Sequence, residues 1–307
     1  MKKKLALIVT LIIIILLNGC IGKNKVADDA SKSTKTKKIV LASKPMTEQF
    51  IIAEILKVLI EQETDIEVEY KEGIGGGTSN IHPAMKTGEI DLYPEYTGTG
   101  WMFVLGQPLI NDPVELYKAV KEGYKDSFAI VWSELYGFND TFGIAMKRKL
   151  AEEMDIKTYS DLAAKSKELT FGAEHDFFER EDGLPGIVEV YGFDFKKEVG
   201  MDIGLKYQAI GSDEVDVINI FSTDGRLKEY DMTVLEDDLN FFPSYYCATL
   251  IRQETLDTYP ELVDVLDLMT GLINNEEMTN MNYQVEIEKL EASEVARKFL
   301  TDNGLLK

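Results

Sequence analysis

Aromatic rings and small polar groups are concentrated in four short stretches of this sequence. These are LYPEYTGTGW, GFNDTFG, FSTDGR and NFFPSYYC, which begin at Leu92, Gly137, Phe221 and Asn240. Rings that line a cleft attract a quaternary ammonium group through the negative faces of their π systems, at about 0.5–2 kcal/mol for each contact. Such a cation has no N–H donors, so rings are the groups that hold it best. We interpret the four stretches as walls of one cation site, although each alone is also consistent with rings that close the edge of a core.

Residues that could perform catalysis or bind a metal form no recognisable arrangement. The two histidines, His82 and His175, belong to no H-E-x-x-H motif, and no C-x-x-C spacing or triad pattern is present. His175 lies close to Asp176 and Arg180, so an exported enzyme centred on these three residues is one alternative. Cys247, in the apolar stretch YYCATL, is typical of a buried small hydrophobe. We therefore expect a binding protein without catalytic activity, metal or cofactor.

The glycine-rich stretch GIGGGTSN, which begins at Gly73, has the composition of a phosphate-binding loop but not its spacing. The Gly-Lys-Ser/Thr ending of a P-loop is absent, and the glycines do not fit the G-x-G-x-x-G pattern. A helix N-terminus can bind an anion, but glycines between a strand and a helix are also typical of an ordinary turn. We interpret the stretch as a turn and do not expect nucleotide binding.

The N-terminus has the pattern of an export signal. Residues 2–4 are lysines, and residues 5–17 form an almost unbroken apolar run, which leads into the ending LNGC over 17–20. The run is shorter than the roughly 20 residues that a membrane-spanning helix needs. The ending resembles the bacterial lipobox L-x-G-C, in which the cysteine is lipidated. We expect a signal peptide over residues 1–19 and a lipid on Cys20; an uncleaved signal anchor or an ordinary signal peptide is the alternative.

The residues after Cys20 predict a tether between the lipid and a folded body. Residues 21–37 are mostly Lys, Ser, Thr and Asp, with few apolar side chains to bury. The chain contains only one other cysteine, Cys247, so lipidation of Cys20 excludes an internal disulfide. Stability must then come from a hydrophobic core, which a chain of this length can build. We expect a protein attached to the extracytoplasmic face of the cell membrane.

The net charge restricts the class of partner. The chain carries a formal charge of −21 at pH 7, whereas nucleic-acid binding depends on clustered cations. Nucleic acid and an anionic membrane surface are therefore excluded as ligands. A cationic or zwitterionic small molecule is compatible with this charge.

The first third of the body alternates strands and helices, the pattern of an α/β fold. KIVLAS over 38–43 predicts a strand, and Thr47 is the expected cap of an amphipathic helix that follows. DIEVEYK predicts a half-buried strand, and a second helix is expected to extend through Met85. Ligand sites in such folds lie on loops beyond the ends of strands.

The alternation continues to the C-terminus. The segments FGIAMK, LTFGAE, LKYQAI, MTVLEDD and CATLIRQ are predicted as strands. DEVDVINIF is predicted as a helix, and Ser160 as the cap of another. Residues 260–273 and the chain from 276 onward are predicted as helices, with Gly304 as the C-cap of the last. We find no internal repeat.

These blocks together resemble a known family, the substrate-binding lipoproteins of ABC importers for compatible solutes. Members take up glycine betaine, carnitine, choline and related osmoprotectants. The resemblance is carried by SKPMTEQ, GEIDLYPEYTGTG, GFNDTFGIAM, FFEREDGLPG, FSTDGRL and LEDDLNFFPSYYCATLIR, which span the whole body.

The resemblance implies a two-lobe α/β clamshell of the type II periplasmic-binding-protein class. The first lobe would comprise residues 38–139 plus 245–307, and the second residues 140–244. The chain would cross the hinge twice, near Asp140 and near Tyr245, and the ligand would lie in the cleft between the lobes.

The resemblance also implies an aromatic box around the trimethylammonium group. The tyrosines of the family's box match Tyr96 and Tyr245, and the two other box positions are Phe142 and Phe221 here. Phenylalanine keeps the π face and loses only the hydroxyl, so the box should still bind a cation. The backbone carbonyl of Asp140 would contact the methyl groups.

The family holds the carboxylate end of a betaine with a lysine or glutamine, a threonine and an arginine, which match Lys44, Thr99 and Arg180. The planar fork of arginine suits a carboxylate, and choline has none. We therefore expect glycine betaine as ligand, or carnitine or proline betaine. A choline-selective protein of the same family is the alternative.

The remaining expectations concern partners. The sequence contains neither permease helices nor a P-loop, so the permease and the ATPase would be separate chains, and we expect a monomer. A surface scaffold whose aromatic loops bind protein is a further alternative.

Overall fold

The structure of the protein is a computed structural model that describes residues 37–227 and 229–307. The expected signal peptide, the lipidated Cys20 and the tether lie outside the described residues, except for Lys37, which begins the first strand. Among the described residues, no helix combines the length and the apolar character needed to cross a membrane.

The first sheet has the strand order β2-β1-β3-β10-β4. Its strands are β1 (Lys37–Ala42), β2 (Ile66–Lys71), β3 (Leu92–Tyr96), β4 (Ile130–Trp132) and β10 (Cys247–Arg252). β1 runs parallel to β2 and β3, whereas β10 is antiparallel to β3 and β4. A strand from late in the chain therefore lies between two early ones. We call this sheet and its helices the first lobe.

The second sheet has the order β7-β6-β8-β5-β9. Its strands are β5 (Phe142–Lys147), β6 (Thr170–Glu174), β7 (Lys197–Met201), β8 (Val217–Phe221) and β9 (Met232–Val234). β6 is parallel to β7 and β8, and β5 is antiparallel to β8 and β9. We call this sheet and its helices the second lobe. The α/β prediction is confirmed in both lobes.

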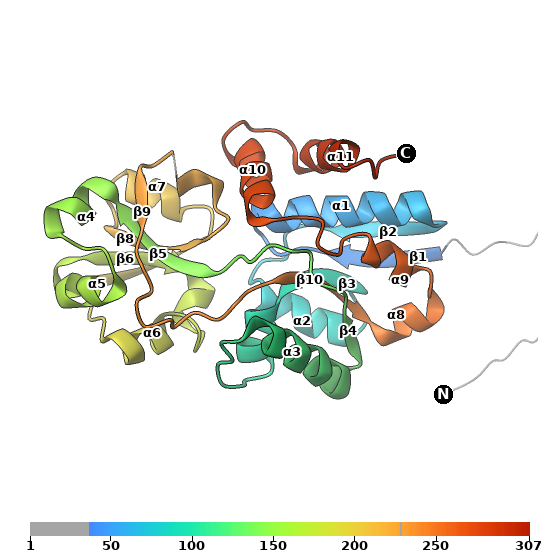
Figure 1. Ribbon diagram of the computed structural model, residues 1–307, viewed down its shortest axis with the longest axis horizontal. Helices are drawn as coiled ribbons and strands as arrows, with labels where there is room; N and C mark the ends of the chain where they lie inside the picture. The colour runs from blue at the N-terminus through green and yellow to red at the C-terminus, as the bar shows by residue number, and fades with distance from the viewer. Residues whose placement is uncertain (1–36, 228) are drawn as a thin grey trace, which may run out of the picture. The chain divides into compact units, whose positions relative to one another are not determined.

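Helices cover both faces of the first sheet (Figure 1), with α1 on one face and α2 and α3 on the other. They are α1 (Thr47–Glu63), α2 (Thr78–Lys86), the π-helix η1 (Thr99–Val104), α3 (Pro113–Phe128), α8 (Gln253–Thr258), α9 (Leu262–Asp267), α10 (Asn275–Glu286) and α11 (Ala292–Asp302). α1 packs against β1, β2 and β3 on one side and against α9, α10 and α11 on the other. Its residues are therefore buried almost all round.

The second lobe has shorter helices. They are α4 (Arg148–Met154), α5 (Tyr159–Lys165), η2 (Ser166–Glu168), η3 (His175–Phe178), α6 (Leu184–Tyr191), α7 (Lys206–Gly211) and η4 (Gly225–Leu227). The cap of α5 is Thr158 rather than the expected Ser160, because Thr158 and Asp161 form a capping box. α1 is preceded by Met46, without a side-chain cap, rather than being capped by Thr47. Gly304 has a φ of 69° just after α11, as expected for a helix end.

Two adjacent segments exchange their predicted structures. LKYQAI was expected as a strand, but 206–211 form α7, in which Tyr207 and Ile210 are buried three residues apart. DEVDVINIF was expected as a helix, but its apolar end forms β8 between β6 and β5. β8 is buried along almost its whole length, and such a strand is apolar without alternation. A short apolar run of this kind does not distinguish helix from strand.

Two chain segments connect the lobes, one between β4 and β5 and the other between β9 and β10. They meet at an isolated antiparallel bridge between Asn139 and Tyr246. The backbone N–H of Asp140 donates to the carbonyl of Tyr245 at 3.0 Å. The predicted lobe boundaries, at 139/140 and 244/245, fall in these two connections and remain a prediction.

Candidate ligand-binding site

One cavity of about 450 Å³ is lined by residues of both lobes. All eight residues predicted to bind ligand line it: Lys44, Tyr96, Thr99, Asp140, Phe142, Arg180, Phe221 and Tyr245. The structure therefore brings together side chains that are up to about 200 positions apart in the sequence.

The ends of strands position the four rings. Tyr96 ends β3, and Phe142 begins β5 directly opposite Phe221, which ends β8. Tyr245 lies two residues before β10, whose first residue pairs with Tyr96. The stretch around Tyr96, which sequence reasoning treated as a loop, is thus a central strand that continues into the π-helix η1.

The rings of Phe142, Phe221 and Tyr245 form a contiguous group. Phe142 lies 5.2 Å from Phe221 and 5.3 Å from Tyr245, centroid to centroid, and the second pair is edge-to-face. Gly98 makes room for Tyr245, because a Cβ atom there would lie 2.6 Å from the Cε1 atom of that ring. The absence of a side chain at Gly98 thus accommodates a box ring.

Cations of the chain itself lie over three of the four rings. The Nζ atom of Lys44 is 4.8 Å from the centroid of Tyr96, and the guanidinium of Arg180 is 5.2 Å from that of Phe142. The Nζ atom of Lys206 is 4.4 Å from the centroid of Phe221. These distances lie within the range of cation–π attraction.

Lys44 is paired with a buried carboxylate that sequence reasoning missed. Its ammonium forms an ion pair with Glu95, whose side chain is fully buried. Glu95 also accepts hydrogen bonds from Thr78 at 2.9 Å and from the backbone N–H of Tyr96 at 2.8 Å. The positive charge of Lys44 is therefore largely compensated. One signal was available, because Glu95 stands beside Tyr96 in the YPEYTGT block.

Arg180 is paired in the same way with Asp182, neither with Asp176 nor with Glu179. Its Nε donates to Asp182 at 2.7 Å, and its Nη2 donates both to Asp182 and, at 3.2 Å, to Thr99. Asp182 also accepts the hydroxyl proton of Tyr245 at 2.8 Å. Burial lowers the pKa of Arg180, but the charge and hydrogen bonds of Asp182 outweigh that effect and raise it. Asp182 thus fixes both the arginine and a box ring.

A second buried acid fixes Tyr96. The Tyr96 hydroxyl donates to Glu48 at 2.5 Å and accepts from the side chain of Gln49 at 3.1 Å. Glu48 also contacts the hydroxyl of Thr223, in the turn after β8, at 2.6 Å. Glu48 and Thr223 were not among the predicted residues, because neither lies in an aromatic or basic position of the motifs.

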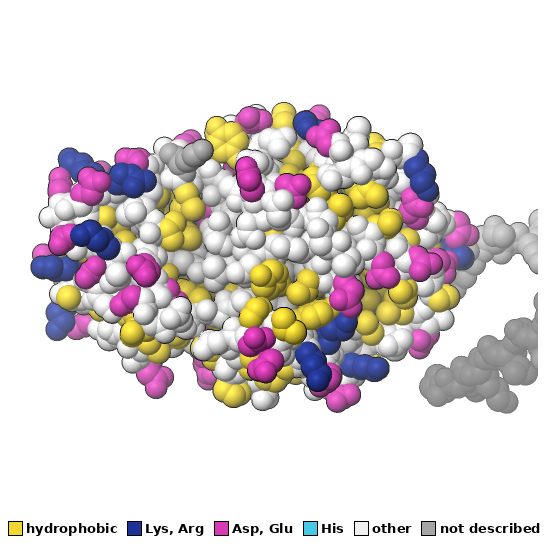
Figure 2. All heavy atoms as spheres, viewed as in Figure 1, with side chains coloured by type: hydrophobic (Ala, Val, Ile, Leu, Met, Phe, Trp, Pro, Cys, Tyr) yellow, Lys and Arg dark blue, Asp and Glu magenta, His cyan; other side chains and the backbone are white. Residues whose placement is uncertain are grey.

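The electrostatic balance of the cavity is acidic. Two cations line it, each already paired, together with four acids: Asp140, Glu174, Asp176 and Asp202. Glu174 is engaged by Lys206 at 3.1 Å and by Asn219 at 2.7 Å. Figure 2 shows acidic side chains distributed over the visible face of the protein as well, interspersed with basic ones. Such surroundings favour a ligand with a positive charge.

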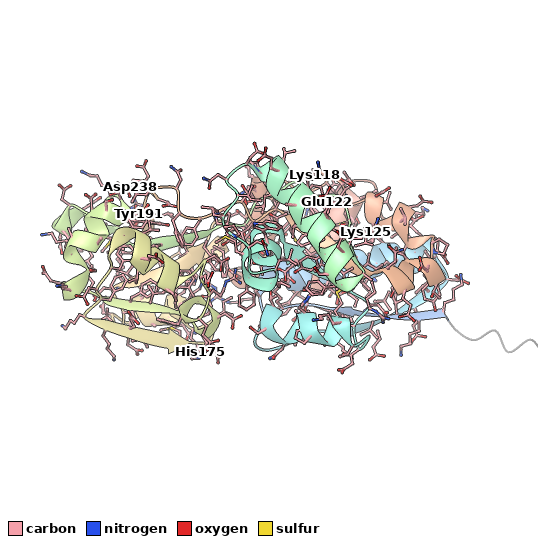
Figure 3. The ribbon with its side chains drawn as sticks, turned by 90° about the horizontal axis from the view of Figure 1, so that it is seen from below. Lys118, Glu122, Lys125, His175, Tyr191 and Asp238 are labelled. Atoms are coloured by element: carbon pink, nitrogen blue, oxygen red, sulfur yellow. The ribbon has the colours of Figure 1, made fainter. Side chains whose placement is uncertain are left out.

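The residues of the alternative enzyme centre lie on η3 and just after it. His175 is exposed on η3, where Figure 3 labels it. Across residues 37–227 and 229–307, no side-chain hydrogen bond joins His175, Asp176 and Arg180 to one another, and no group of acids, histidines and cysteines is arranged to hold a metal ion. The glycine loop, read as a turn, contributes Gly75, Gly76 and Gly77 to the cavity wall.

A family comparison matches nearly the whole described part of the chain. The OpuAC family, described as the substrate binding domain of ABC-type glycine betaine transport system, matches residues 37–302.

Three bacterial relatives are similar over most of the chain. The ergothioneine transport permease/ergothioneine binding protein EgtU of Helicobacter pylori (strain G27) is 43% identical over 88% of this chain, which spans about half, 48%, of that protein's length. The carnitine transport binding protein OpuCC of Listeria monocytogenes is 37% identical over 84% of each chain. A glycine-betaine-binding protein of Pseudomonas aeruginosa is 30% identical over 87% of this chain and 88% of its own.

Solved structures share the architecture. A crystal structure of a glycine betaine/carnitine/choline ABC transporter has a TM-score of 0.70 and 31% identity, and covers 89% of this chain and 100% of its own. Lactococcal OpuAC in its closed-liganded conformation with glycine betaine has a TM-score of 0.61 and 15% identity, over 88% of this chain and 100% of its own, and is alike in fold alone. These similarities confirm the predicted two-lobe fold of the periplasmic-binding-protein type.

Proposed function

This chain belongs to the family of substrate-binding domains of ABC-type glycine betaine transport systems, and from that premise we propose that its cavity captures a quaternary ammonium zwitterion for an importer. The observation that carries the proposal is the convergence of four rings, from β3, β5, β8 and the segment before β10, on one acidic cavity. Rings provide the attraction that a cation without N–H donors requires.

The ligand's carboxylate would be received by donors that the ion pairs leave unused. Arg180 has five N–H groups, and its Nη1 makes no hydrogen bond to any residue within 37–227 or 229–307. The ammonium group of Lys44 has three N–H donors and uses one of them to bind Glu95. Because both cations are compensated, they favour a carboxylate less strongly than free charges would. Glycine betaine remains the first expectation, with choline as the weaker ligand.

A larger betaine is a second candidate, favoured by the size of the cavity. Glycine betaine has eight heavy atoms, and at about 30 Å³ for each water-sized group it fills no more than roughly 240 Å³. The cavity of about 450 Å³ is much larger and continues past the rings to His175 and Met201. Ergothioneine, the betaine in the name of the Helicobacter relative, carries a ring that would use this space.

A ligand screen tests the proposal. The purified protein is heated with glycine betaine, carnitine, proline betaine, choline or ergothioneine in large excess. A ligand at about 100 times its dissociation constant adds about 2.7 kcal/mol to the free energy of unfolding, which raises the melting temperature visibly. The proposal fails if none of the five raises it. Turnover of a solute instead of reversible binding would favour the enzyme alternative.

The proposal also covers the membrane anchor, the importer subunits and the two lobes. Cys20 carries a lipid that holds the protein at the outer face of the cell membrane, as the lipobox indicates. The permease and the ATPase are separate chains that meet a monomeric binding protein. Residues 38–139 plus 245–307 and residues 140–244 act as the two lobes that close over the ligand.

A further inference from the structure

The hydroxyl of Thr223 lies between two buried carboxyl groups. Its oxygen is 2.6 Å from Oε2 of Glu48 and 2.8 Å from Oδ1 of Asp140. None of the three residues is more than 4% exposed. A hydroxyl carries one proton and can donate to only one of the two carboxyl groups. The other contact therefore requires a proton on a carboxyl oxygen, which donates to the hydroxyl oxygen.

No cation in the described ranges compensates either acid. Glu48 accepts from Tyr96 at 2.5 Å and from the side chain of Asn282 at 3.5 Å, and Asp140 accepts from the backbone N–H of Thr223 at 3.4 Å. Neither acid forms an ion pair with any residue of 37–227 or 229–307. Two ionised carboxylates joined by one hydroxyl would be strongly disfavoured at this burial. One proton removes the repulsion and completes the hydrogen bonds.

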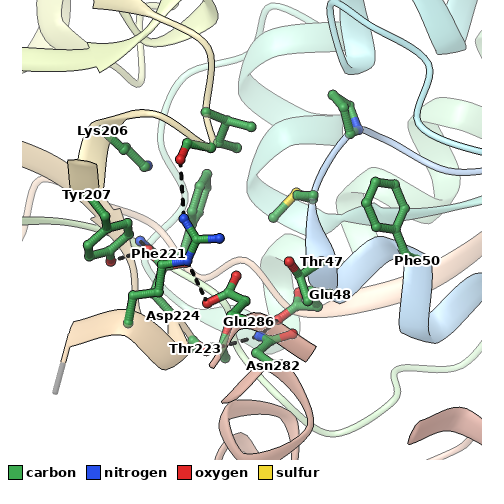
Figure 4. Close-up of a pocket in the computed structure, with 15 residues that line it drawn as sticks. Thr47, Glu48, Phe50, Lys206, Tyr207, Phe221, Thr223, Asp224, Asn282 and Glu286 are labelled. Carbon is green, nitrogen blue, oxygen red and sulfur yellow. Dashed lines mark hydrogen bonds and ion pairs between the residues drawn. The ribbon is translucent and has the colours of Figure 1, made fainter. Parts of the chain in front are cut away.

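A second cavity of about 210 Å³ lies beside the first, and Figure 4 shows Glu48, Thr223 and Asn282 in its wall. The charged and titratable groups that face the two acids from the packed elements are Lys44, Glu95, Tyr96, Lys206, Tyr207, Asp224, Arg226, Cys247 and Glu286. The cations among them are engaged elsewhere, Lys44 with Glu95, Lys206 with Glu174 and Arg226 with Glu286.

The titration behaviour agrees with the geometry. Burial raises the pKa of Glu48 to about 7, although the hydrogen bonds from Thr223, Tyr96 and Asn282 lower it. Burial, followed by the charges of Glu48 and Asp224, raises the pKa of Asp140 well above its ordinary value. When one of a pair of interacting carboxyl groups ionises, the other holds its proton more tightly.

We infer that Glu48 and Asp140 share one proton through the Thr223 hydroxyl, and that Glu48 is the positioning residue that holds the box ring Tyr96. Two arrangements keep the same hydrogen bonds. In one, Glu48 donates to Thr223, which donates to Asp140; in the other, both directions are reversed. They interconvert when one carboxyl group gives its proton to the hydroxyl oxygen while the hydroxyl proton passes to the other carboxylate, so no proton is gained or lost.

The ligand selects between the two arrangements, a step that rests on the proposed function. Asp140 lines the ligand cavity, whereas Glu48 lines only the second one. A quaternary ammonium group in the box is stabilised by a negative charge on Asp140, and the proton then resides on Glu48. The hydrogen bond between Glu48 and Thr223 joins α1 of the first lobe to the turn after β8 of the second. Loss of the proton would leave two adjacent charges across the lobes.

The pH dependence of unfolding tests the shared proton without any ligand. A folded-state pKa of about 7 for Glu48, above the unfolded value of about 4.3, stabilises the protein below pH 4, and this stability is lost as pH rises toward 7. Glu48→Gln and Asp140→Asn each supply a fixed N–H donor and keep the hydrogen-bond pattern. From pH 5 to 8, the folding equilibrium constant of either variant should rise about a hundredfold relative to wild type. Glu61→Gln, an exposed control on the same helix, should follow wild type.

Infrared spectroscopy supplies the second readout. The wild-type full chain at neutral pH should show the carbonyl band of an un-ionised carboxyl group that is absent from both amide variants. With ¹³C-labelled glutamate, the share of that band at the labelled position should increase when glycine betaine, carnitine or ergothioneine is added. Parallel pH profiles for wild type and both variants, or no un-ionised band, would overturn the inference. If none of the five solutes of the ligand screen binds but the profiles differ, the proposed function fails and the shared proton stands.

Discussion

The tyrosines and the phenylalanines of the site are held by different forces. Tyr96 donates to Glu48, and Tyr245 donates to Asp182, so each hydroxyl ties its ring to a buried acid. Phe142 and Phe221 lack that bond and are positioned by facing each other across β5 and β8. The hydroxyls of the tyrosines therefore orient their rings, while the π faces of Tyr96, Phe142 and Phe221 already attract cations of the chain itself.

Removing a ring should weaken binding without abolishing the fold. Tyr96→Ala and Tyr245→Ala are each expected to cost the best quaternary ammonium ligand about 0.5–2 kcal/mol or more, since each loses one cation–π contact. Phe142→Tyr and Phe221→Tyr should change affinity only modestly, because the π face is kept. Calorimetric titration gives the four affinities. An unchanged affinity in both alanine variants would mean that the box is built from other residues.

The role of Arg180 needs a variant that leaves no buried charge behind. Arg180→Ala alone would strand Asp182, and breaking such a pair typically costs about 3–5 kcal/mol of stability. We expect the double variant Arg180→Gln/Asp182→Asn to fold and to lose about 2 kcal/mol or more of its binding free energy for glycine betaine. Choline should lose little, so the preference for betaine should fall by at least one decade, about 1.4 kcal/mol.

The matched control for this experiment is Asp182→Asn. It keeps the positive charge of Arg180 but leaves that charge without its partner in the ligand-free protein, so the melting temperature should fall. A betaine carboxylate can still pair with Arg180, so betaine binding should be retained. Equal losses for betaine and choline in the double variant would instead assign Arg180 a structural role and make the choline alternative the better proposal.

The sequence predicted which residues line the cavity, but it did not predict the buried acids that pair with them. Tyr96, Phe142 and Arg180 lie in conspicuous motif blocks, and all line the cavity. Glu48 and Asp182 are common acids whose pairing depends on side-chain positions fixed only by tertiary packing. A carboxylate opposite Arg180 is expected on physical grounds once burial is known, but which acid supplies it is set by the turn between η3 and α6.

At the level of elements, the order of strands at the lobe boundary places the rings. β3 and β10 pair in the first lobe and β5 and β8 in the second, and each pair ends at the cavity. The segment 205–221 shows where sequence reasoning fails. Its apolar run is too short for hydrophobic periodicity to distinguish a helix from a strand. Val217–Phe221 form a strand, β8, because this position in the sheet buries apolar side chains on both faces.

The contact between η1 and the segment before β10 depends on Gly98. In Gly98→Ala the added Cβ would lie 2.6 Å from the ring of Tyr245, so the ring must move. Overpacking of this kind costs about 1–3 kcal/mol of stability, and the displaced ring should weaken ligand binding as well. Gly75→Ala is the control, because it lines the same cavity but has no atom within 4 Å of the added Cβ. Thermal unfolding and calorimetry should separate the two variants; identical behaviour would contradict the packing role.

At the level of the whole molecule, the acidic charge affects the attraction of ligands, whereas the proposed anchor affects the location of the protein. The charge of −21 attracts cations from solution over a Debye length of about 8 Å at physiological ionic strength. The anchor determines only where the protein resides. Along the outward face of α3, Figure 3 shows Lys118, Glu122 and Lys125, so that helix presents mixed charge to its surroundings.

Membrane retention and ligand binding should therefore be separable. Cys20→Ala removes the proposed lipid attachment and is expected to leave ligand affinity unchanged, because Cys20 lies outside residues 37–302 that match the family. Wild type should partition into the detergent phase and the variant into the aqueous phase. Equal partitioning of the two forms would contradict the lipoprotein proposal.

The placement of β10 also sets an order of folding. All five strands of the second sheet come from one continuous stretch, 142–234, whereas the first sheet is completed only when β10 inserts between β3 and β4. During synthesis the second lobe can reach its native contacts while β3 still has an open edge. Non-local pairing of this kind is slow and exposes an unpaired strand. A chain that stops before Cys247 would keep a native second lobe attached to a first lobe with an unprotected, aggregation-prone edge.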